Sequence, residues 1–558
     1  MTGPYRRLTR PGRRLARRSG QRSGQWLARR SERRLARRSG RRPGQPPAVA
    51  LGLCLLLLAG CTLGPSQRPA LATSGTGEPA PPGTATSGPV IGPGGPGQQT
   101  DPVRWFACND VDPVDPSTRM TFTVECASVL VASKGTDGSD NQVVEIARAR
   151  AAGVPQDAPD LVVLSGEPGQ NGRSRVASVA AGLSPALRQR VAVITVDLPG
   201  TGQTAAIDCV SGSDARAIVS LGADPTRPTA ASALDKLSRS LTFECGDLAG
   251  AGLSLLNTSS ATDALDAVRA ALGRPTLDVL GKGFGATLAA VYADRYPGRV
   301  GRIVLDAPSD PLDAADTTAA AVARASEAAL DRFAAACPSF DGGCPLGNRP
   351  RTAVTNLVAA LDNATLGSGD ATAGTVLFAL LLGLGQPARW PELATALARA
   401  AAADTSPITQ LLERQLGLDG GSGWLNGSII YRCNDSPLRI SPEQLSDAVK
   451  GIRSDAPLFG PFTEGLVGIC TDWPAPETAL GAVTATGAPP MLVLGAVDDP
   501  VAPYDAVRSL AGQLGSASLA SWQSGQHGSY PASPCMTGIV DGYLRDGQLP
   551  GVGTLCPP

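Results

Sequence analysis

The sequence is poor in the residues that build metal sites. It has 558 residues but a single histidine, His527, and none of its twelve cysteines forms a Cys-x-x-Cys pair. Structural zinc sites take their ligands from closely spaced cysteines together with histidines. We therefore expect no metal site. Lysine is also scarce, and its four occurrences are Lys134, Lys236, Lys282 and Lys450.

Acidic residues are almost absent from the N-terminal segment, although the whole chain carries 49 basic and 49 acidic residues. Residues 1–47 contain sixteen arginines and one acidic residue, Glu32. The rest of the chain therefore holds 33 basic and 48 acidic side chains, a net charge of about −15. An acidic body argues against nucleic acid as a partner. The basic segment itself is a low-complexity repeat that forms no packed core.

The apolar run Ala48–Gly60 is too short to cross a bilayer as a helix. With the basic residues before it, it predicts a secretory signal over residues 1–60, whose true start codon stays open. Its end, Leu58-Ala-Gly-Cys61, looks like a bacterial lipobox and predicts cleavage before Cys61 and lipidation of its thiol. The alternative is an ordinary signal peptide with an incidental cysteine. Residues 61–101, rich in Pro, Gly, Ser and Thr, would then tether an exported protein to the outer side of the cell membrane.

Ten cysteines remain after the predicted signal and Cys61, an even number. In an exported protein this implies disulfide bonds. Pairing each cysteine with its neighbour in sequence predicts five bridges, although the sequence alone leaves the connectivity open. The predicted pairs are Cys108–Cys126, Cys209–Cys245, Cys337–Cys344, Cys433–Cys470 and Cys535–Cys556.

Beyond residue 102, short apolar strands alternate with helical segments. After a predicted hairpin within residues 120–147, strands are expected at 160–165, 191–196, 277–280, 302–305, 490–494 and 517–522. Near-continuous apolar strands between helices predict an α/β fold with a mostly parallel sheet flanked by helices. From residue 312 to 484 alanine-rich helices replace this alternation. We interpret them as a cap domain inserted between two core segments, 102–311 and 485–558.

The stretch from Thr276 to Ala293 has the order strand, glycine-rich turn, helix. In α/β-hydrolases this order forms a nucleophile elbow, in which Gly-x-Ser-x-Gly lifts a serine onto a strained corner. Here the turn reads Gly281-Lys-Gly-Phe-Gly285, so Gly283 occupies the nucleophile position, and the helix is expected from Ala286. Lys282 is expected to be a solvated lysine whose side chain points away from the triad.

Two candidate partners for the elbow follow the predicted cap. The strand 490–494 runs into Asp498 and Asp499, and His527 comes about thirty residues later. α/β-hydrolases place nucleophile, acid and histidine in this order along the chain. We therefore expect an aspartate of this loop and His527 at the catalytic site.

From about residue 103 onward the chain resembles the secreted tripeptidyl aminopeptidase-like α/β-hydrolases, relatives of prolyl aminopeptidases. Asp499-Pro-Val-Ala-Pro503 matches the family's acid loop, Asp-Pro-x-Thr-Pro, and favours Asp499 over Asp498 as the triad acid. Other matching motifs are Val304-Leu-Asp306, Cys433-Asn-Asp435, Cys470-Thr-Asp-Trp-Pro474 and residues 547–556. The resemblance implies an exported peptidase that removes short peptides from free N-termini beneath a helical cap, with no cofactor.

Three loops depart from this family pattern. Besides Gly283, the oxyanion loop Gly-Gly-Pro-Gly reads Gly166-Glu167-Pro168-Gly169. Backbone N–H groups of this loop and of Phe284 are expected to form the oxyanion hole, where the Glu167 carboxylate would oppose negative charge if it points inward. A third motif, Asp-x-Arg-Gly-x-Gly-x-Ser, has Pro199 in place of its arginine.

Two functional hypotheses follow. The preferred one is an exported lipoprotein of this family that has lost serine-peptidase chemistry and binds a peptide or another small ligand in a pocket under the cap. The alternative is an active hydrolase that uses a non-standard nucleophile or a water activated by His527. No second Gly-x-Ser-x-Gly follows a strand, and Ser254 and Ser422 lie in unsuitable surroundings. A purely structural or partner-binding role has no positive feature in its favour.

Overall fold

The computed structural model describes residues 103–114, 120–131, 142–363, 371–418, 423–476 and 479–558. These residues all belong to one compact unit, Pro93–Pro558. The predicted signal, Cys61, the tether and Ser422 lie outside the described residues. Within the described ranges no helix is long and apolar enough to cross a membrane, and no three His, Cys, Asp or Glu side chains are grouped as metal ligands.

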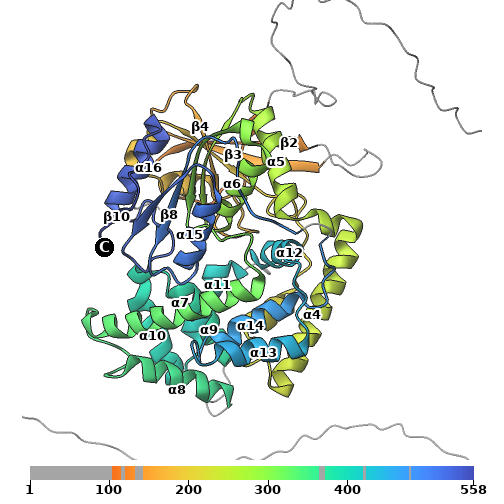
Figure 1. The fold of residues 1–558 in the computed structure, drawn as a ribbon, viewed down its shortest axis with the longest axis vertical. Helices are drawn as coiled ribbons and strands as arrows, with labels where there is room; N and C mark the ends of the chain where they lie inside the picture. Colours follow the sequence, from red (N-terminus) through yellow and green to blue (C-terminus); the bar gives the residue numbers. More distant parts are fainter. Residues whose placement is uncertain (1–102, 115–119, 132–141, 364–370, 419–422, 477–478) are drawn as a thin grey trace, which may run out of the picture. The chain divides into compact units, whose positions relative to one another are not determined.

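A ten-stranded sheet forms the centre of this unit (Figure 1). Its strand order is β1-β2-β3-β5-β4-β6-β7-β8-β9-β10, and all neighbours from β5 to β10 are parallel. The antiparallel pair β2–β3 is the predicted hairpin. The mostly parallel sheet confirms the predicted α/β-hydrolase fold class. The strands are β1 (Phe106–Ala107), β2 (Phe122–Val131), β3 (Gln142–Ala151), β4 (Asp160–Leu164), β5 (Ala192–Val196), β6 (Leu277–Lys282), β7 (Val300–Asp306), β8 (Met491–Ala496), β9 (Ala517–Trp522) and β10 (Thr554–Cys556).

Alternating side chains of the strands pack against helices on opposite faces of the sheet. Leu161 and Val162 of β4 belong to two different buried clusters, as do Leu492 and Val493 of β8. Successive side chains of a strand point to opposite faces, which explains why these strands are apolar at nearly every position. The cluster with Val162 includes α5 (Thr258–Ala271), α6 (Phe284–Arg295) and α15 (Tyr504–Gln513), whereas that with Leu161 includes α1 (Val176–Ala181), α2 (Pro185–Arg188) and α16 (Pro534–Asp546). Two further helices, α3 (Gly212–Val219) and α4 (Pro228–Ala249), precede α5.

Between β7 and β8 the described chain contains helices and no strand. Figure 1 shows several of these helices grouped together below the strands. They contact the loop after β9, since the Gly385 carbonyl after α9 accepts the backbone N–H of His527. Helices occupy this segment, as the alanine-rich pattern predicts, while the domain boundaries at 312 and 484 stay predictions. The helices of this insertion are α7 (Ala315–Ala336), α8 (Pro350–Asp362), α9 (Ala373–Gly383), α10 (Trp390–Ala401), α11 (Ser406–Leu416), α12 (Leu425–Asp435), α13 (Pro442–Ile452) and α14 (Gly460–Val467).

The five predicted disulfide bonds are all present. Each joins a cysteine to its neighbour in sequence, over separations of 7 to 37 residues. Their Cα–Cα distances of 4.8 to 5.8 Å lie in the usual range for a disulfide. The bridges are Cys108–Cys126, Cys209–Cys245, Cys337–Cys344, Cys433–Cys470 and Cys535–Cys556.

Candidate functional site at the elbow

Gly283 stands alone at the corner between β6 and α6, with φ of 54° and ψ of −123°. The helix begins at Phe284, two residues before the predicted start. Gly281 and Gly285, which flank this corner, lie so close to neighbouring backbone that neither has room for a side chain. A Cβ on Gly281 would lie 2.4 Å from the Gly285 carbonyl oxygen, and one on Gly285 would lie 2.5 Å from the Ser165 carbonyl oxygen. The elbow geometry is therefore present, with a residue at its corner that has no side chain to attack a substrate.

The space beside Gly283 is filled by the neighbouring loop. A Cβ built on Gly283 would lie 2.7 Å from the carbonyl oxygen of Gly166. The same oxygen accepts the backbone N–H of Phe284 at 2.8 Å. That N–H group is the expected oxyanion donor, so in this structure the donor is already occupied by a backbone carbonyl. The predicted oxyanion residues Gly166 and Phe284 are thus brought together, but in a closed arrangement.

Glu167 extends toward the helical insertion. Its Oε2 lies 3.5 Å from a guanidinium nitrogen of Arg432 on α12, and the Arg432 side chain is 62% exposed. An exposed pair at this distance contributes little, about 0–1 kcal/mol. The carboxylate therefore has a cationic partner on α12, in keeping with a loop that closes toward the insertion.

Asp499 and His527 form the expected pair. His527 Nδ1 lies 2.9 Å from Asp499 Oδ2, while Asp499 Oδ1 accepts the backbone N–H groups of Val501 and Ala502 at 2.8 and 3.1 Å. Burial opposes protonation of the imidazole, but the charge and hydrogen bond of Asp499 outweigh it, and the pKa of His527 is raised above its usual value. The adjacent Asp498 instead contacts Arg332 of α7. Asp499 rather than Asp498 is thus the aspartate that holds the histidine.

Two charged residues that the sequence analysis did not assign to the site lie beside His527. Asp306, at the end of β7, is buried and accepts backbone N–H groups of Ser529 and Tyr530. Lys282 is half-buried, and a Cβ on Gly528 would lie 2.1 Å from its Cε. The expectation of a solvated lysine pointing away from the triad is therefore wrong. Asp306 could have been found from its position, since the carboxyl ends of neighbouring parallel strands meet at one edge of the sheet.

Helix α12 contacts all three loops that depart from the family pattern. The Tyr431 ring packs edge-on against Phe284 with centroids 5.6 Å apart, and its hydroxyl donates to the Pro199 carbonyl at 3.0 Å. Arg432 pairs with Glu167, as described above. At the N-cap of α12, about two turns earlier, the backbone approaches the oxyanion loop, because a Cβ on Gly169 would lie 2.4 Å from the Trp424 carbonyl oxygen. The elbow is therefore covered by α12.

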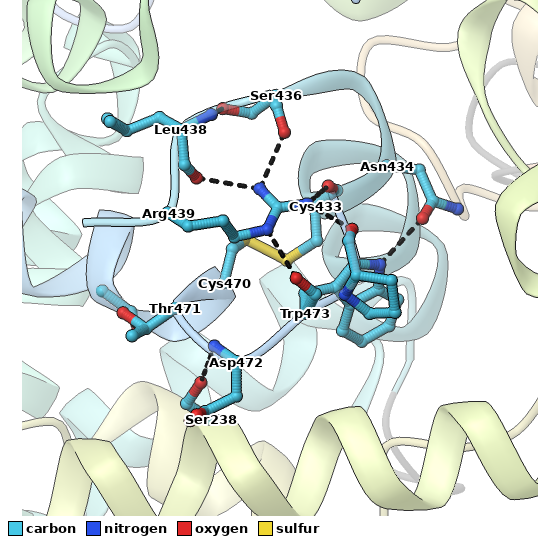
Figure 2. Close-up of a disulfide and its surroundings, with 12 residues drawn as sticks. Ser238, Cys433, Asn434, Ser436, Leu438, Arg439, Cys470, Thr471, Asp472 and Trp473 are labelled. Atoms are coloured by element: carbon cyan, nitrogen blue, oxygen red, sulfur yellow. Dashed lines mark hydrogen bonds between the residues drawn. A yellow bond between two sulfur atoms is a disulfide. The ribbon is translucent and has the colours of Figure 1, made fainter. Parts of the chain in front are cut away.

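The C-terminal end of α12 is firmly anchored (Figure 2). Cys433 is bonded to Cys470, and Trp473 Nε1 donates to Asn434 Oδ1 at 2.7 Å. The Arg439 guanidinium donates to five backbone carbonyls in this region, at 2.6 to 2.8 Å, which uses all five of its N–H groups. The disulfide bond and these hydrogen bonds therefore fix the position of α12 over the elbow. The five acceptors are Cys433, Ser436, Leu438, Trp473 and Pro474.

Two small cavities lie in this part of the described structure, one beside the elbow and one beside the acid loop. One, lined among others by Glu167, Leu198 and Phe284, holds about 10 Å³. A second, between the start of α7 and the acid loop and lined by Asp313 and Val501, also holds about 10 Å³. Each has room for about one water molecule. Neither of these two cavities holds a peptide unless residues that line it move.

The chain is similar to several known proteins. The model of the TAP-like protein family matches residues 456–556, a segment that contains both Asp499 and His527. "Serine protease Hip1" of Mycobacterium tuberculosis is 28% identical over 486 residues, which cover 82% of this chain and 91% of that protein. "Carboxylesterase B" of M. tuberculosis is 28% identical over 529 residues, covering 90% and 98%. "Tripeptidyl aminopeptidase" of Streptomyces lividans is 26% identical over 382 residues, covering 65% and 70%.

Among solved structures, proline iminopeptidase of M. smegmatis is 14% identical, with a TM-score of 0.36 and coverage of 75% of this chain and 97% of that one. The three sequence relatives cover 65 to 90% of the chain, one of them is named a tripeptidyl aminopeptidase, and the matching family model is that of TAP-like proteins. The resemblance is thereby confirmed. The chain belongs to the tripeptidyl aminopeptidase-like family of α/β-hydrolases.

Proposed function

We propose that this protein is an exported, lipid-anchored member of the family that binds peptide-like ligands at the elbow and has lost serine-dependent peptidase turnover. The observation that carries the proposal is the corner at Gly283. It offers no hydroxyl, and the Gly166 carbonyl takes up both the place of a side chain and the Phe284 N–H group. Losing triad members typically removes about 10⁴–10⁶-fold of the rate of a serine peptidase.

The ligand class follows from the relatives and from the part of the site that is retained. The names of two relatives describe a serine protease and a tripeptidyl aminopeptidase, proteins that act on peptides. The Asp499–His527 pair remains in hydrogen-bonding geometry and offers a polar contact for a peptide group. Entry of such a ligand requires displacement of the α12 cover. We therefore expect slow association, because binding has to await a conformational change.

Export and anchoring rest on the lipobox-like Leu58–Cys61 and on the disulfide bonds. Five disulfides suit an oxidising compartment outside the cytoplasm. Lipidation of Cys61 would hold the body outside the cell membrane, and stable anchoring needs more than one acyl chain.

The retained Asp499–His527 pair favours one second candidate, a hydrolase in which His527 activates a water molecule. An aspartate that fixes the tautomer and orientation of a histidine is the arrangement of a general base. Without a covalent intermediate and with the Phe284 N–H engaged, such hydrolysis would be slow.

The deciding experiment combines turnover with binding. Release of a chromogenic group from tripeptide substrates is measured for wild type, Gly283→Ser, Gly283→Ser/Glu167→Gly and His527→Ala. We expect no detectable wild-type turnover, a small gain in Gly283→Ser, and a larger gain in the double variant. The serine Cβ has to displace the Gly166 carbonyl, and glycine at 167 frees the loop from Arg432.

Three outcomes contradict the proposal. Wild-type turnover that is abolished by His527→Ala but unaffected by Gly283→Ser identifies the water-based hydrolase. Labelling of the wild type by a fluorophosphonate probe reveals a nucleophile elsewhere. Binding of the same tripeptides to wild type, followed by calorimetry, tests the remaining part, and its absence over hours of incubation refutes peptide binding.

A further inference from the structure

The loop that follows His527 is held by the ends of two neighbouring strands. Lys282 ends β6 and Asp306 ends β7, and the two residues are direct partners in the parallel register. Partners in a parallel pair point their side chains to the same face of the sheet. Both side chains contact residues 528–530, so two adjacent strands hold the loop that follows His527.

Asp306 fixes the backbone of this loop. Its two carboxylate oxygens accept the Ser529 N–H at 2.8 and 2.9 Å, and one of them also accepts the Tyr530 N–H at 3.0 Å. The side chain is buried, and burial raises the pKa of Asp306 while the charge of Lys282 and these hydrogen bonds oppose the rise. A buried carboxylate is stable only when it is paired and hydrogen-bonded. The positive charge of Lys282 favours the ionised form of this carboxylate.

Lys282 reaches this position because residue 528 is glycine. Gly528 has φ of +78°, and an added Cβ would lie 2.1 Å from Lys282 Cε and 2.5 Å from Nζ. The lysine tail therefore runs directly over the backbone next to His527. A larger residue at 528 would displace the tail.

Three charged groups act on the imidazole of His527. Asp499, on the acid loop, and Asp306, on β7, favour its protonation, whereas burial and Lys282, on β6, oppose it. From the insertion, Arg332 on α7 binds Asp498 and lies near Gly525, and the loop after α9 contributes the neutral Gly385. Lys282, whose tail lies against the neighbouring Gly528, thus opposes the effect of the two carboxylates on the imidazole.

We propose that Lys282 and Asp306 form a second charge pair behind Asp499–His527, which positions the histidine loop and restrains protonation of His527. Asp306 fixes the loop through the backbone, and Lys282 offsets the field of the two carboxylates. Both are positioning residues that act through His527. The inference goes beyond the proposed function, because it concerns the state of the histidine in the resting protein and does not depend on turnover.

Because the chain has a single histidine, the protonation of His527 can be measured directly. In the full chain labelled with ¹³C at histidine Cε1, one NMR signal reports the titration of His527. We expect Lys282→Met to shift the titration of His527 to higher pH. The control is Lys450→Met, which removes the same charge from an exposed lysine paired with Asp447. An unchanged titration in Lys282→Met, or an equal shift in the control, overturns the proposal.

A second variant and its control keep the Lys282 charge, but the variant moves that charge away from His527. Gly528→Ala displaces the flexible lysine tail toward water, where its field is screened, so the titration should again shift to higher pH. Gly553→Ala is the matched control, since Gly553 also has φ of +78° but an added Cβ meets no described atom within 4 Å. These variants decide the question if Lys282→Met does not fold. Equal titration midpoints in the two alanine variants contradict the proposal.

Asp306→Asn tests the positioning of the loop. Loss of the charge-assisted hydrogen bonds should accelerate amide hydrogen exchange of Ser529 and Tyr530 at least tenfold and shift the His527 titration to lower pH. The double variant Lys282→Met/Asp306→Asn removes both charges and should bring the titration back toward that of wild type. Unchanged exchange at Ser529 and Tyr530 shows that Asp306 does not hold the loop.

Discussion

Substituting alanine for Gly283 and, as a control, for Gly250 tests how strongly the Gly166 carbonyl resists displacement from the elbow. The two glycines have the same φ of 54°, with ψ of −123° and −136°. A Cβ on Gly250, at the end of α4, meets no described atom within 4 Å, whereas on Gly283 it lies 2.7 Å from Gly166 O. Alanine therefore introduces similar backbone strain at both positions, but a close steric contact only at position 283.

The expected destabilisation follows from these two terms. An L-residue forced to positive φ costs about 1–2 kcal/mol. Overpacking against fixed neighbours adds about 1–3 kcal/mol. We expect Gly250→Ala to lower the free energy of unfolding by about 1–2 kcal/mol and Gly283→Ala by about 2–5 kcal/mol. The loss of unfolded-state entropy is common to both substitutions and cancels in their difference.

Scanning calorimetry of the two variants and wild type provides the measurement. With about 2 cal/mol/K of unfolding entropy per residue, 1 kcal/mol corresponds to roughly 1 °C for a unit the size of Pro93–Pro558. Gly283→Ala should therefore unfold about 1–3 °C below Gly250→Ala. Equal unfolding temperatures would show that the Gly166 carbonyl moves aside without cost. The closed oxyanion arrangement would then be no obstacle, and Gly283→Ser alone should suffice to restore a nucleophile.

Three further predictions concern the anchor, the disulfides and pH. Cys61→Ser should release the protein into the medium, and unchanged membrane retention, followed by fractionation and immunoblotting, would contradict the lipid anchor. Peptide mapping without reductant should find the five neighbour pairs, and a free thiol at any of the ten cysteines would break the scheme. Burial raises the pKa of Asp435 to about 6, although its hydrogen bonds with Thr258 oppose the rise. The folded state therefore binds this proton more tightly than the unfolded state, and stability from Asp435 is lost as pH rises from about 4 to 6. Asp435→Asn, which still accepts the Thr258 N–H, should raise the unfolding temperature relative to wild type more at pH 7 than at pH 4.5; an equal change at both pH values would refute this.

Much of the fold could be predicted from local patterns. Apolar strands such as residues 191–196 are buried at almost every position because helices cover both faces of the sheet, so their composition identifies them. The glycines of the elbow are recognisable because each is needed where the backbone comes close to its neighbours. Each cysteine pairs with its neighbour in sequence, over at most 37 residues, so chain order alone predicts the pairs even where helices such as α3 and α13 lie between them. These features depend on residues close in sequence, which is why the sequence determines them.

Contacts between distant segments decided the state of the site. The Gly166 carbonyl reaches Gly283 across more than one hundred residues, and α12 reaches the same corner from the insertion. No local sequence pattern indicates that the Gly166 carbonyl oxygen occupies the space where a side chain of residue 283 would lie. The direction of Lys282 was predicted wrongly for the same reason, since it depends on the space left by Gly528. Hydrophobic periodicity determines where strands and helices form, but loops take their conformation from the surfaces that they meet, and those surfaces exist only once the chain has folded.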